Sequence, residues 1–430
     1  MNADVPAAPS IIPDLDTAPP IPIAPIPTYP SKHRVLIALC CGTFVASLVT
    51  IAPPPLFPQI ARDLQVSVPL LGQIMTAMLL LSAALGLIFG PLSDRFGYHR
   101  LILAGLVAAA ATLLTFGLAP SFLVLVLASA TGAMADAAVN GPSLALAGTH
   151  FEGSAGRRAV GWTNGAAALS AIVGVPVLTA IGAVAGWRAA FVAVGLAALA
   201  IVLVAFVGLP RHHHPAGEPF RLDALLGPYR PLLREPTMRR LYAARALSSV
   251  CWYGLLTYLG AFLANVLGMQ AGHIGLVYMA GGTAFFLGSV AVGGPLVRVP
   301  ARMLVVAGYA IMALLMGIAL SARLGPLGTA ALIAVSALAM GVGVVGLIAL
   351  FLDETPSGAG TTLTLSGAVF NLGGATGGAI GGALLAFSGY DAVAIGLPLF
   401  GLAAALLGWR PARARTEGIV NDGMGKGIGP

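Results

Sequence analysis

Long apolar runs alternate with short polar breaks from Val35 to Trp409. Each run approaches or exceeds the roughly 20 apolar residues that a helix needs to cross the hydrocarbon core of a bilayer. The runs cover residues 35–57, 70–91, 101–119, 121–146, 159–183, 188–209, 239–262, 274–296, 302–321, 326–351, 360–386 and 392–409. The pattern predicts an all-α membrane protein with twelve transmembrane helices.

The longest polar break, residues 210–238, divides these runs into six and six. We therefore expect two six-helix bundles, over 32–209 and 239–410, joined by a cytoplasmic linker over 210–238. Residues 1–31 hold nine prolines and no basic residue, which predicts a disordered cytoplasmic tail rather than a secretory signal. Residues 411–430 form a second cytoplasmic tail.

The two halves resemble each other in sequence. Gly90-Pro91-Leu92 has a counterpart in Gly294-Pro295-Leu296, and Gly186-Trp187 has one in Gly389-Tyr390. Both pairings use an offset of about 203 residues. The repetition predicts two six-helix pseudo-repeats related by an axis along the membrane normal, which is a transporter architecture.

Composition agrees with the hydropathy pattern. The chain is 58% hydrophobic and 9% charged, which excludes a soluble enzyme, a nucleic-acid-binding module and a disulfide-stapled secreted domain. With the amino terminus in the cytoplasm, eighteen of the 22 Lys and Arg fall inside and three fall outside. Positive residues resist translocation, so we expect a multi-pass protein of the plasma or inner membrane with both termini cytoplasmic. The net charge of +7 then needs no nucleic-acid partner.

A motif between the second and third runs, residues 90–100, has the sequence GPLSDRFGYHR. It resembles the G-x-L-x-D-R-x-G loop of the major facilitator superfamily. The resemblance implies the major facilitator fold and a cytoplasmic gate at Gly90, Asp94, Arg95 and Gly97. The two glycines would permit a tight turn, and Asp94 would act as a latch that breaks when the halves rock.

Three further segments resemble the twelve-span drug:proton antiporters and their sugar-efflux relatives. They are PPPLFPQIARDL at 53–64, the fifth-run pair of GVP at 174–176 and GWRAAF at 186–191, and FNLG at 370–373. The resemblance implies export, with a helix bend at Gly174 and Pro176. The branch carries an Arg four residues before Gly132 that is linked to proton transfer, but this chain has Ala128 there.

Of fifteen Asp and Glu, only Asp136 lies deep within a predicted span. An acid at the membrane centre is costly and marks a functional site by default. Asn140 follows one helical turn later, and Asn371 is a further polar residue expected in the cavity. Asp136 could exchange a proton for substrate. Alternatively, it is a structural carboxyl bonded to a neighbouring helix.

Arg245 is the one basic residue within a predicted span. The family architecture places its helix at the central cavity, so Arg245 could be the partner of Asp136 or contact an anion. Alternatively, its side chain snorkels to the cytoplasmic surface. Trp252 and Tyr253 could offer stacking faces to an aromatic or cationic substrate, or could serve only packing and an interfacial belt.

Other motifs carry little chemistry. His212–His214 lie in the predicted linker without carboxylate or Cys partners, so we expect no metal site there. The GVGVVG run at 341–346 lies inside an apolar helix, which favours helix packing over dinucleotide binding. Glycines repeat every four residues at 373, 377, 381 and at 374, 378, 382, which predicts close packing of that helix. No cofactor is expected.

Together these features predict a secondary active transporter and not an enzyme. We expect proton-coupled efflux of a small organic molecule (a drug, sugar or metabolite) by alternating access in a monomer. The alternatives are an uptake permease or uniporter for a small metabolite, and a transport-dead membrane sensor whose tails bind a partner.

Overall fold

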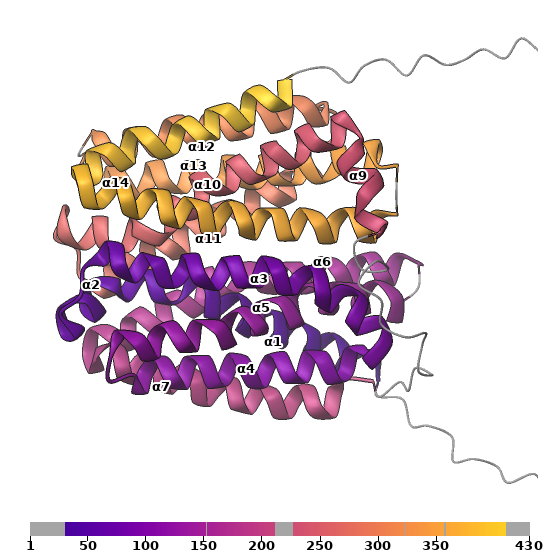
Figure 1. The fold of residues 1–430 in the computed structure, drawn as a ribbon, viewed down its shortest axis with the longest axis horizontal. Helices are drawn as coiled ribbons and strands as arrows, with labels where there is room; N and C mark the ends of the chain where they lie inside the picture. The colour runs from indigo at the N-terminus through magenta and orange to yellow at the C-terminus, as the bar shows by residue number, and fades with distance from the viewer. Residues whose placement is uncertain (1–30, 152, 211–226, 323, 357, 410–430) are drawn as a thin grey trace, which may run out of the picture.

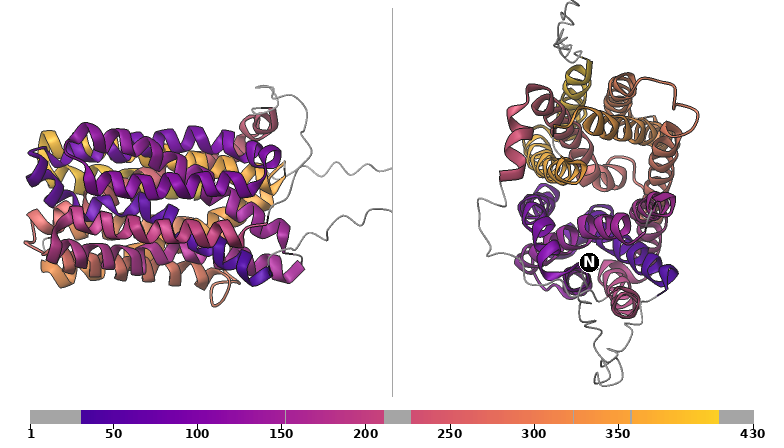
Figure 2. Two further views of the ribbon diagram at one scale, coloured as in Figure 1. Left: turned by 90° about the horizontal axis from the view of Figure 1, so that it is seen from below. Right: turned by 90° about the vertical axis from the view of Figure 1, so that its right-hand side faces the viewer.

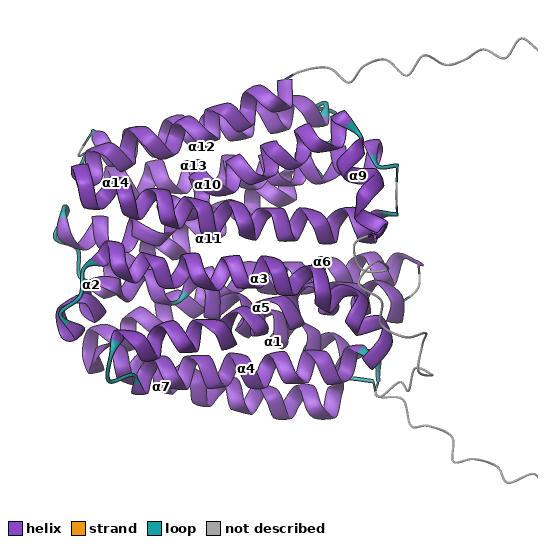
Figure 3. Ribbon diagram, in the orientation of Figure 1, coloured by secondary structure: helices purple, strands orange, loops and turns teal. Residues whose placement is uncertain are grey.

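A computed structural model describes residues 31–151, 153–210, 227–322, 324–356 and 358–409, and in these ranges helix is the only regular structure (Figures 1 and 3). The helices form two bundles that lie side by side, and the right-hand view of Figure 2 shows them along the helix axes. The first bundle contains α1 (Lys32–Ile51), α2 (Pro53–Leu64), α3 (Val68–Phe96), α4 (Tyr98–Leu118), α5 (Phe122–His150), α6 (Gly153–Leu169), a π-helix (Ser170–Gly174) and α7 (Val175–Gly208).

The second bundle follows a 3-10 turn at Gly227–Tyr229. It contains α9 (Arg230–Arg234), α10 (Pro236–Asn265), α11 (Ala271–Val292), α12 (Ala301–Ser321), α13 (Gly325–Glu354) and α14 (Ala359–Trp409). The predicted linker over 210–238 thus includes α9 and the first turn of α10, and Leu232 of α9 is fully buried. The predicted tails at 1–31 and 411–430 lie outside the described residues, apart from Ser31.

Ten helical segments in the described residues are long and apolar enough to cross a membrane. Two of them, Arg158–Gly208 and Ala359–Trp409, have 51 residues each. A straight helix of that length would span about 75 Å, more than twice the hydrocarbon thickness. Each contains one glycine with non-helical geometry, Gly186 (φ 83°) and Gly389 (φ 72°). The twelve-span count and the two six-helix repeats stay predictions.

The motif at 90–100 is not the loop that the sequence predicted. α3 continues through residues 90–96, and α4 begins at Tyr98 directly after Gly97. Gly97 has a φ of 85°, which a glycine adopts without steric cost, so this single residue reverses the chain. Gly90, Asp94 and Arg95 are helical in backbone, but the side chains of Asp94 and Arg95 lie outside what the structure describes.

The glycine ladders of α14 pack as the spacing predicted. A Cβ added at Gly377 would overlap the carbonyl oxygen of Val250 in α10. On the other ladder, a Cβ at Gly378 would lie 2.7 Å from Thr76 Oγ1 in α3. One face of α14 therefore packs within the second bundle, and the other packs against the first bundle.

We call the contact between α3 of the first bundle and α14 of the second bundle the seam. The two helices pack closely over only part of its length. Gly86 lies on the face of α3 that carries Leu79, which faces Gly374 of α14, and Gly367 lies on the face of α14 that carries Gly378. A Cβ at either Gly86 or Gly367 would meet no atom within 4 Å. We call the end beyond these two glycines the open end. At the opposite, closed end, a Cβ at Gly260 of α10 would lie 2.6 Å from the Pro54 carbonyl oxygen of α2.

Candidate substrate cavity and its buried charges

A cavity of about 550 Å³ lies between the two bundles. Both bundles supply its wall, which is mostly apolar with a few polar groups, as is typical of sites for small organic ligands. The polar and aromatic lining includes Ser47, Asp136, Asn140 and Asn164 of the first bundle and Arg245, Trp252, Tyr253, Phe285 and Phe370 of the second.

The Asp136 carboxylate accepts hydrogen bonds from three side chains. Oδ1 accepts from Asn140 Nδ2 at 2.7 Å, and Asn140 lies one turn further along α5. Oδ2 accepts from Asn371 Nδ2 at 3.1 Å and from the Ser82 hydroxyl. Asn371 belongs to α14, so the bonds to this carboxylate join the two bundles.

Two serines complete this cluster, and the sequence did not single them out. Ser82 of α3 also accepts a bond from Asn371 Nδ2 at 3.0 Å, and Ser47 Oγ of α1 lies 3.4 Å from Asn140 Oδ1. Ser82 is 1% exposed. In the sequence, Ser82 is distinguished only as a hydroxyl within an otherwise apolar run. Such a hydroxyl can bond to the backbone of its own helix, so it does not by itself indicate a functional site.

Arg245 is buried in the cavity wall with a side chain 8% exposed. Its guanidinium carbon lies 3.8 Å from the centroid of the Phe370 ring, in cation–π geometry. The Nε and Nη1 atoms are buried and have no hydrogen-bond partner. The alternative in which Arg245 snorkels to the membrane surface is therefore wrong, because Phe370 covers the side chain inside the bundle.

Asp136 and Arg245 line the same cavity but do not form an ion pair. Neither of them takes part in the ion pairs Arg188–Asp63 and Arg302–Glu354. Tyr253 interacts electrostatically with both Asp136 and Arg245. The structure therefore brings the two predicted charges into one cavity without the direct contact that would neutralise them.

The predicted aromatic residues lie in the cavity wall and also pack within the second bundle. The Trp252 ring stacks on Phe285 at 6.3 Å between centroids, with 26° between their planes. The Tyr253 ring meets Phe370 edge-on at 5.3 Å. Trp252 and Tyr253 therefore make the packing contacts that one alternative predicted. Because both also line the cavity, their contact with a ligand stays a prediction.

The predicted helix bend coincides with a change of helix type. Residues Ser170–Gly174 form a π-helix, and Pro176 stands at the start of α7. A Cβ at Gly174 would lie 2.7 Å from Leu48 Cδ1 of α1, so the glycine permits close approach. π-helical segments inside α-helices cause local kinks and are frequent at functional sites. Ser170 lines the cavity, so the irregular segment adjoins it.

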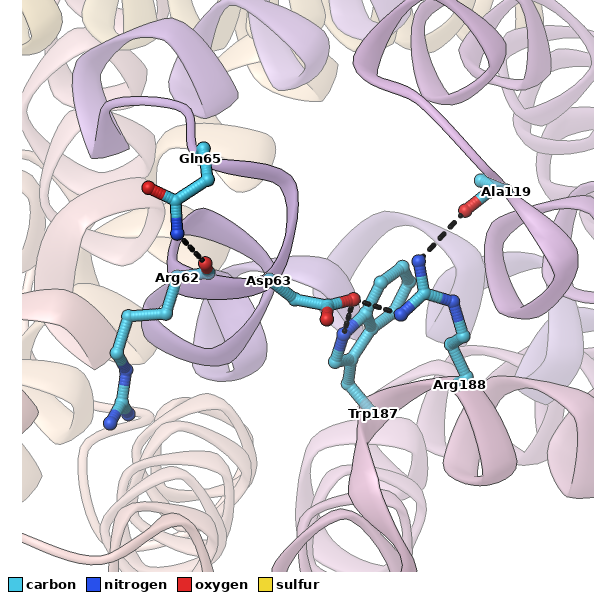
Figure 4. Close-up of polar contacts among 6 residues, drawn as sticks. All are labelled: Arg62, Asp63, Gln65, Ala119, Trp187 and Arg188. Carbon is cyan, nitrogen blue, oxygen red and sulfur yellow. Dashed lines mark hydrogen bonds and ion pairs between the residues drawn. The ribbon is translucent and has the colours of Figure 1, made fainter.

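A polar cluster at the closed end was not predicted (Figure 4). The Asp63 carboxylate at the end of α2 accepts bonds from Trp187 Nε1 at 3.2 Å and from the Arg188 guanidinium. Arg188 Nη2 also donates to the Ala119 carbonyl oxygen at 3.2 Å. Trp187 and Arg188 directly follow the break at Gly186. Two of the motifs quoted above, residues 53–64 and 186–191, therefore meet here.

A cavity between two bundles of apolar helices is typical of membrane transporters. Residues 39–363 match the family model of the Major Facilitator Superfamily, so the chain belongs to this superfamily. It is a multi-pass membrane protein that handles a small-molecule substrate, and it is not an enzyme.

A crystal structure of a bacterial homolog of the human lysosomal transporter Spinster, in an inward-facing and unoccupied conformation, is similar to this chain. The TM-score is 0.64 with 17% sequence identity, and the match covers 88% of this chain and 95% of that chain. At this identity the likeness shows a shared fold. The resemblance to the drug:proton antiporter branch stays a prediction, and His212–His214 lie outside the described residues.

Proposed function

We propose that the protein is a secondary active transporter that exports a small organic molecule in exchange for protons by alternating access. The observation that best supports this proposal is the bonding of Asp136. This carboxylate lines a cavity between two bundles and accepts bonds from both of them. A group placed there can link its own protonation to the relative position of the bundles.

We infer that the two 51-residue segments each cross the membrane twice and reverse at Gly186 and Gly389. A Cβ at Gly396 would lie 2.6 Å from Leu384 Cδ1, which requires the chain to fold back between them. Twelve spans then form two six-helix repeats in a monomer, with both termini in the cytoplasm and the protein in the plasma or inner membrane. In this orientation the open end faces the cytoplasm.

The proposed coupling follows from hydrogen-bond strength. A charged carboxylate accepts bonds that are roughly twice as strong as those to a neutral acceptor. When Asp136 takes up a proton, its bond from Asn371 weakens, and the contact between α14 and the first bundle loosens. The bundles can then rock toward the conformation that opens at the other end.

The remaining predicted residues have supporting roles in this proposal. Asn140 orients Asp136 from within α5, and Trp252 and Tyr253 contact the substrate. Gly174 and Pro176 allow the fifth span to bend. The motif of Gly90, Asp94, Arg95 and Gly97 acts as the gate at the cytoplasmic end.

An uptake permease or uniporter is the second candidate. The observation that favours it is Ala128, which is 4% exposed in α5 where the antiporter branch carries its Arg. An apolar methyl group cannot relay a proton, so the coupling route of that branch is absent. A uniporter would use the same cavity without proton movement.

Inverted membrane vesicles distinguish these functions. A resistance screen across chemically diverse compounds first identifies a transported compound, and vesicles acidified inside then provide the driving force. Exchange predicts that the compound accumulates in the lumen while protons leave. Movement of compound and protons out of the lumen together would identify a proton-coupled uptake permease, and movement without protons would identify a uniporter.

A further inference from the structure

We propose that the cavity binds an amphipathic organic anion, whose acidic group pairs with Arg245 while its apolar body lies along the neighbouring aromatic wall. The inference rests on the proposed transport function, because it assigns the chemistry of the molecule that the cavity carries. The acidic group can be a carboxylate or a sulfonate, since both present oxygens that a guanidinium binds with two parallel bonds.

The first support is the incomplete bonding of Arg245. A guanidinium has five N–H donors, and a buried charge is costly unless it is paired and hydrogen-bonded. Here Nε and Nη1 are buried without a partner, and the side chain is 8% exposed. Tyr309 lies close enough to interact with the guanidinium electrostatically and through a hydrogen bond, but a neutral phenol does not balance its charge. The Phe370 ring contributes cation–π attraction and no acceptor.

The second support is the different state of the acid in the same cavity. Asp136 accepts bonds from Ser82, Asn140 and Asn371, so its oxygens are already occupied. A cationic ligand would have to compete with these donors. An anionic ligand meets unoccupied donors on Arg245, so the charge that lacks a partner in this cavity is positive.

The third support is the surroundings of Arg245. Trp252, Phe285, Phe286 and Phe370 line the same cavity, and so do aliphatic residues such as Ile333. A volume of about 550 Å³ lies within the range of pockets that enclose drug-sized ligands. A fully polar anion would leave this apolar wall without contacts, so an amphipathic molecule fits best.

Binding to the full-length protein in lipid nanodiscs tests the inference without any proton gradient. The probes share a naphthalene body and differ in head group: 2-naphthoate and 2-naphthalenesulfonate are anions, 2-naphthamide is neutral and 2-naphthylmethylammonium is a cation. Isothermal titration calorimetry gives each Kd, with the heat from empty nanodiscs subtracted. We expect the wild type to bind the anions about tenfold or more tightly than the amide.

Variants of Arg245 then test whether this residue causes the preference for anionic probes over the neutral amide. Arg245→Gln is expected to lower anion affinity to that of the amide while leaving amide affinity within about twofold, which also reports that the cavity has formed. Arg245→Lys keeps the charge without the planar fork and should retain a reduced anion preference. Arg239→Gln, at an exposed position on the same helix, should behave as the wild type.

Several results would overturn the inference. They are equal or tighter wild-type binding of the amide or the ammonium compound, no anion binding by the wild type, and an anion preference that survives Arg245→Gln. The proposed transport function fails separately, because a protein that prefers anions here but moves no protons in the vesicle experiment retains this site and loses the coupling.

Discussion

The two buried charges of the cavity have contrasting surroundings. Asp136 accepts hydrogen bonds from α3, α5 and α14, and thus from both bundles. The three side chains that interact with the Arg245 guanidinium belong to the second bundle: Tyr253 of α10, Tyr309 of α12 and Phe370 of α14. Relative motion of the bundles would therefore change the bonding of the acid and leave the surroundings of the arginine intact.

This difference separates two tasks in one cavity. A group that is bonded across a moving seam can respond to the conformation, whereas a group held within one rigid body presents the same surface throughout the cycle. We therefore assign proton coupling to Asp136 and ligand recognition to Arg245. Each prediction below changes a residue that belongs either to the contact between the bundles or to the interior of one bundle.

The largest effect is expected from Asp136→Asn. The amide keeps the shape of the side chain but cannot take up and release a proton, so the transported compound should no longer accumulate in response to a pH gradient. With a gradient of about two units, the loss is about a hundredfold in accumulation ratio for one proton per cycle. Vesicle uptake measures it, and Asp353→Asn, at an exposed acid of α13, is the matched control. Gradient-driven accumulation by Asp136→Asn would disprove the assignment.

A second prediction compares the two ladders of α14. Gly377→Leu would force a side chain into the Val250 backbone of α10, so the second bundle should lose about 1–3 kcal/mol or fail to assemble. Gly378→Leu meets the flexible Thr76 side chain across the seam, so its main effect should be to favour separation of the bundles. Thermal unfolding in detergent should fall much further for Gly377→Leu, and equal losses would contradict the division between the two faces.

A third prediction concerns the bond that crosses the seam. Asn371→Leu removes the donor from the second bundle to Asp136 and should shift the conformational equilibrium by about 1–2 kcal/mol, or about 5–30-fold. Asn140→Leu removes a donor within the first bundle and should shift it little. The shift in each variant can be measured by replacing Gly161, in the cavity wall, with cysteine. An impermeant maleimide added at the open end alkylates this cysteine, and the alkylation rate reports how accessible the cavity is from that end. The rate should fall with Asn371→Leu, and an equal fall with both variants would contradict the prediction.

The smallest effect is expected at the closed-end cluster. Asp63 and Arg188 have side chains 44% and 42% exposed, so solvent screens their ion pair. Asp63→Asn should cost at most about 1 kcal/mol of stability, and the loss should shrink as salt rises. Thermal unfolding at low and high ionic strength measures this, with Arg62→Gln as an exposed neighbouring control. A larger loss that salt does not change would show that the cluster is more than a surface pair.

Much of the site could be predicted because charges and amides in apolar runs are conspicuous. The sequence analysis identified four such residues as candidates: Asp136, Asn140, Arg245 and Asn371. The four-residue glycine spacing of α14 likewise predicted its packing. Ser82 and Ser47 were missed because a hydroxyl costs little in a helix and its partner depends on tertiary packing.

The relations between distant segments were harder to predict. Asp63 and Arg188 are 125 residues apart, and no periodicity connects them. The motif over 90–100 gave the position of the turn at Gly97 but not the continuation of α3, because local sequence does not fix where a membrane helix ends. Nor did the pattern show that Arg245 would be covered by Phe370 rather than reach the surface.

Proton-dependent motion of the seam can be measured directly with spin labels at Gly86→Cys and Gly367→Cys, in a background without the three native cysteines. Both positions are open, so the labels should not disturb packing. Double electron–electron resonance should show the distance between them shorten in the wild type when the pH is lowered from a high to a low value, as Asp136 gains a proton and the open end closes. In Asp136→Asn, which leaves Tyr253 and Arg245 in place, the distance should be the same at both pH values. A wild-type distance that ignores pH, or an Asp136→Asn protein that follows the wild type, would contradict the coupling.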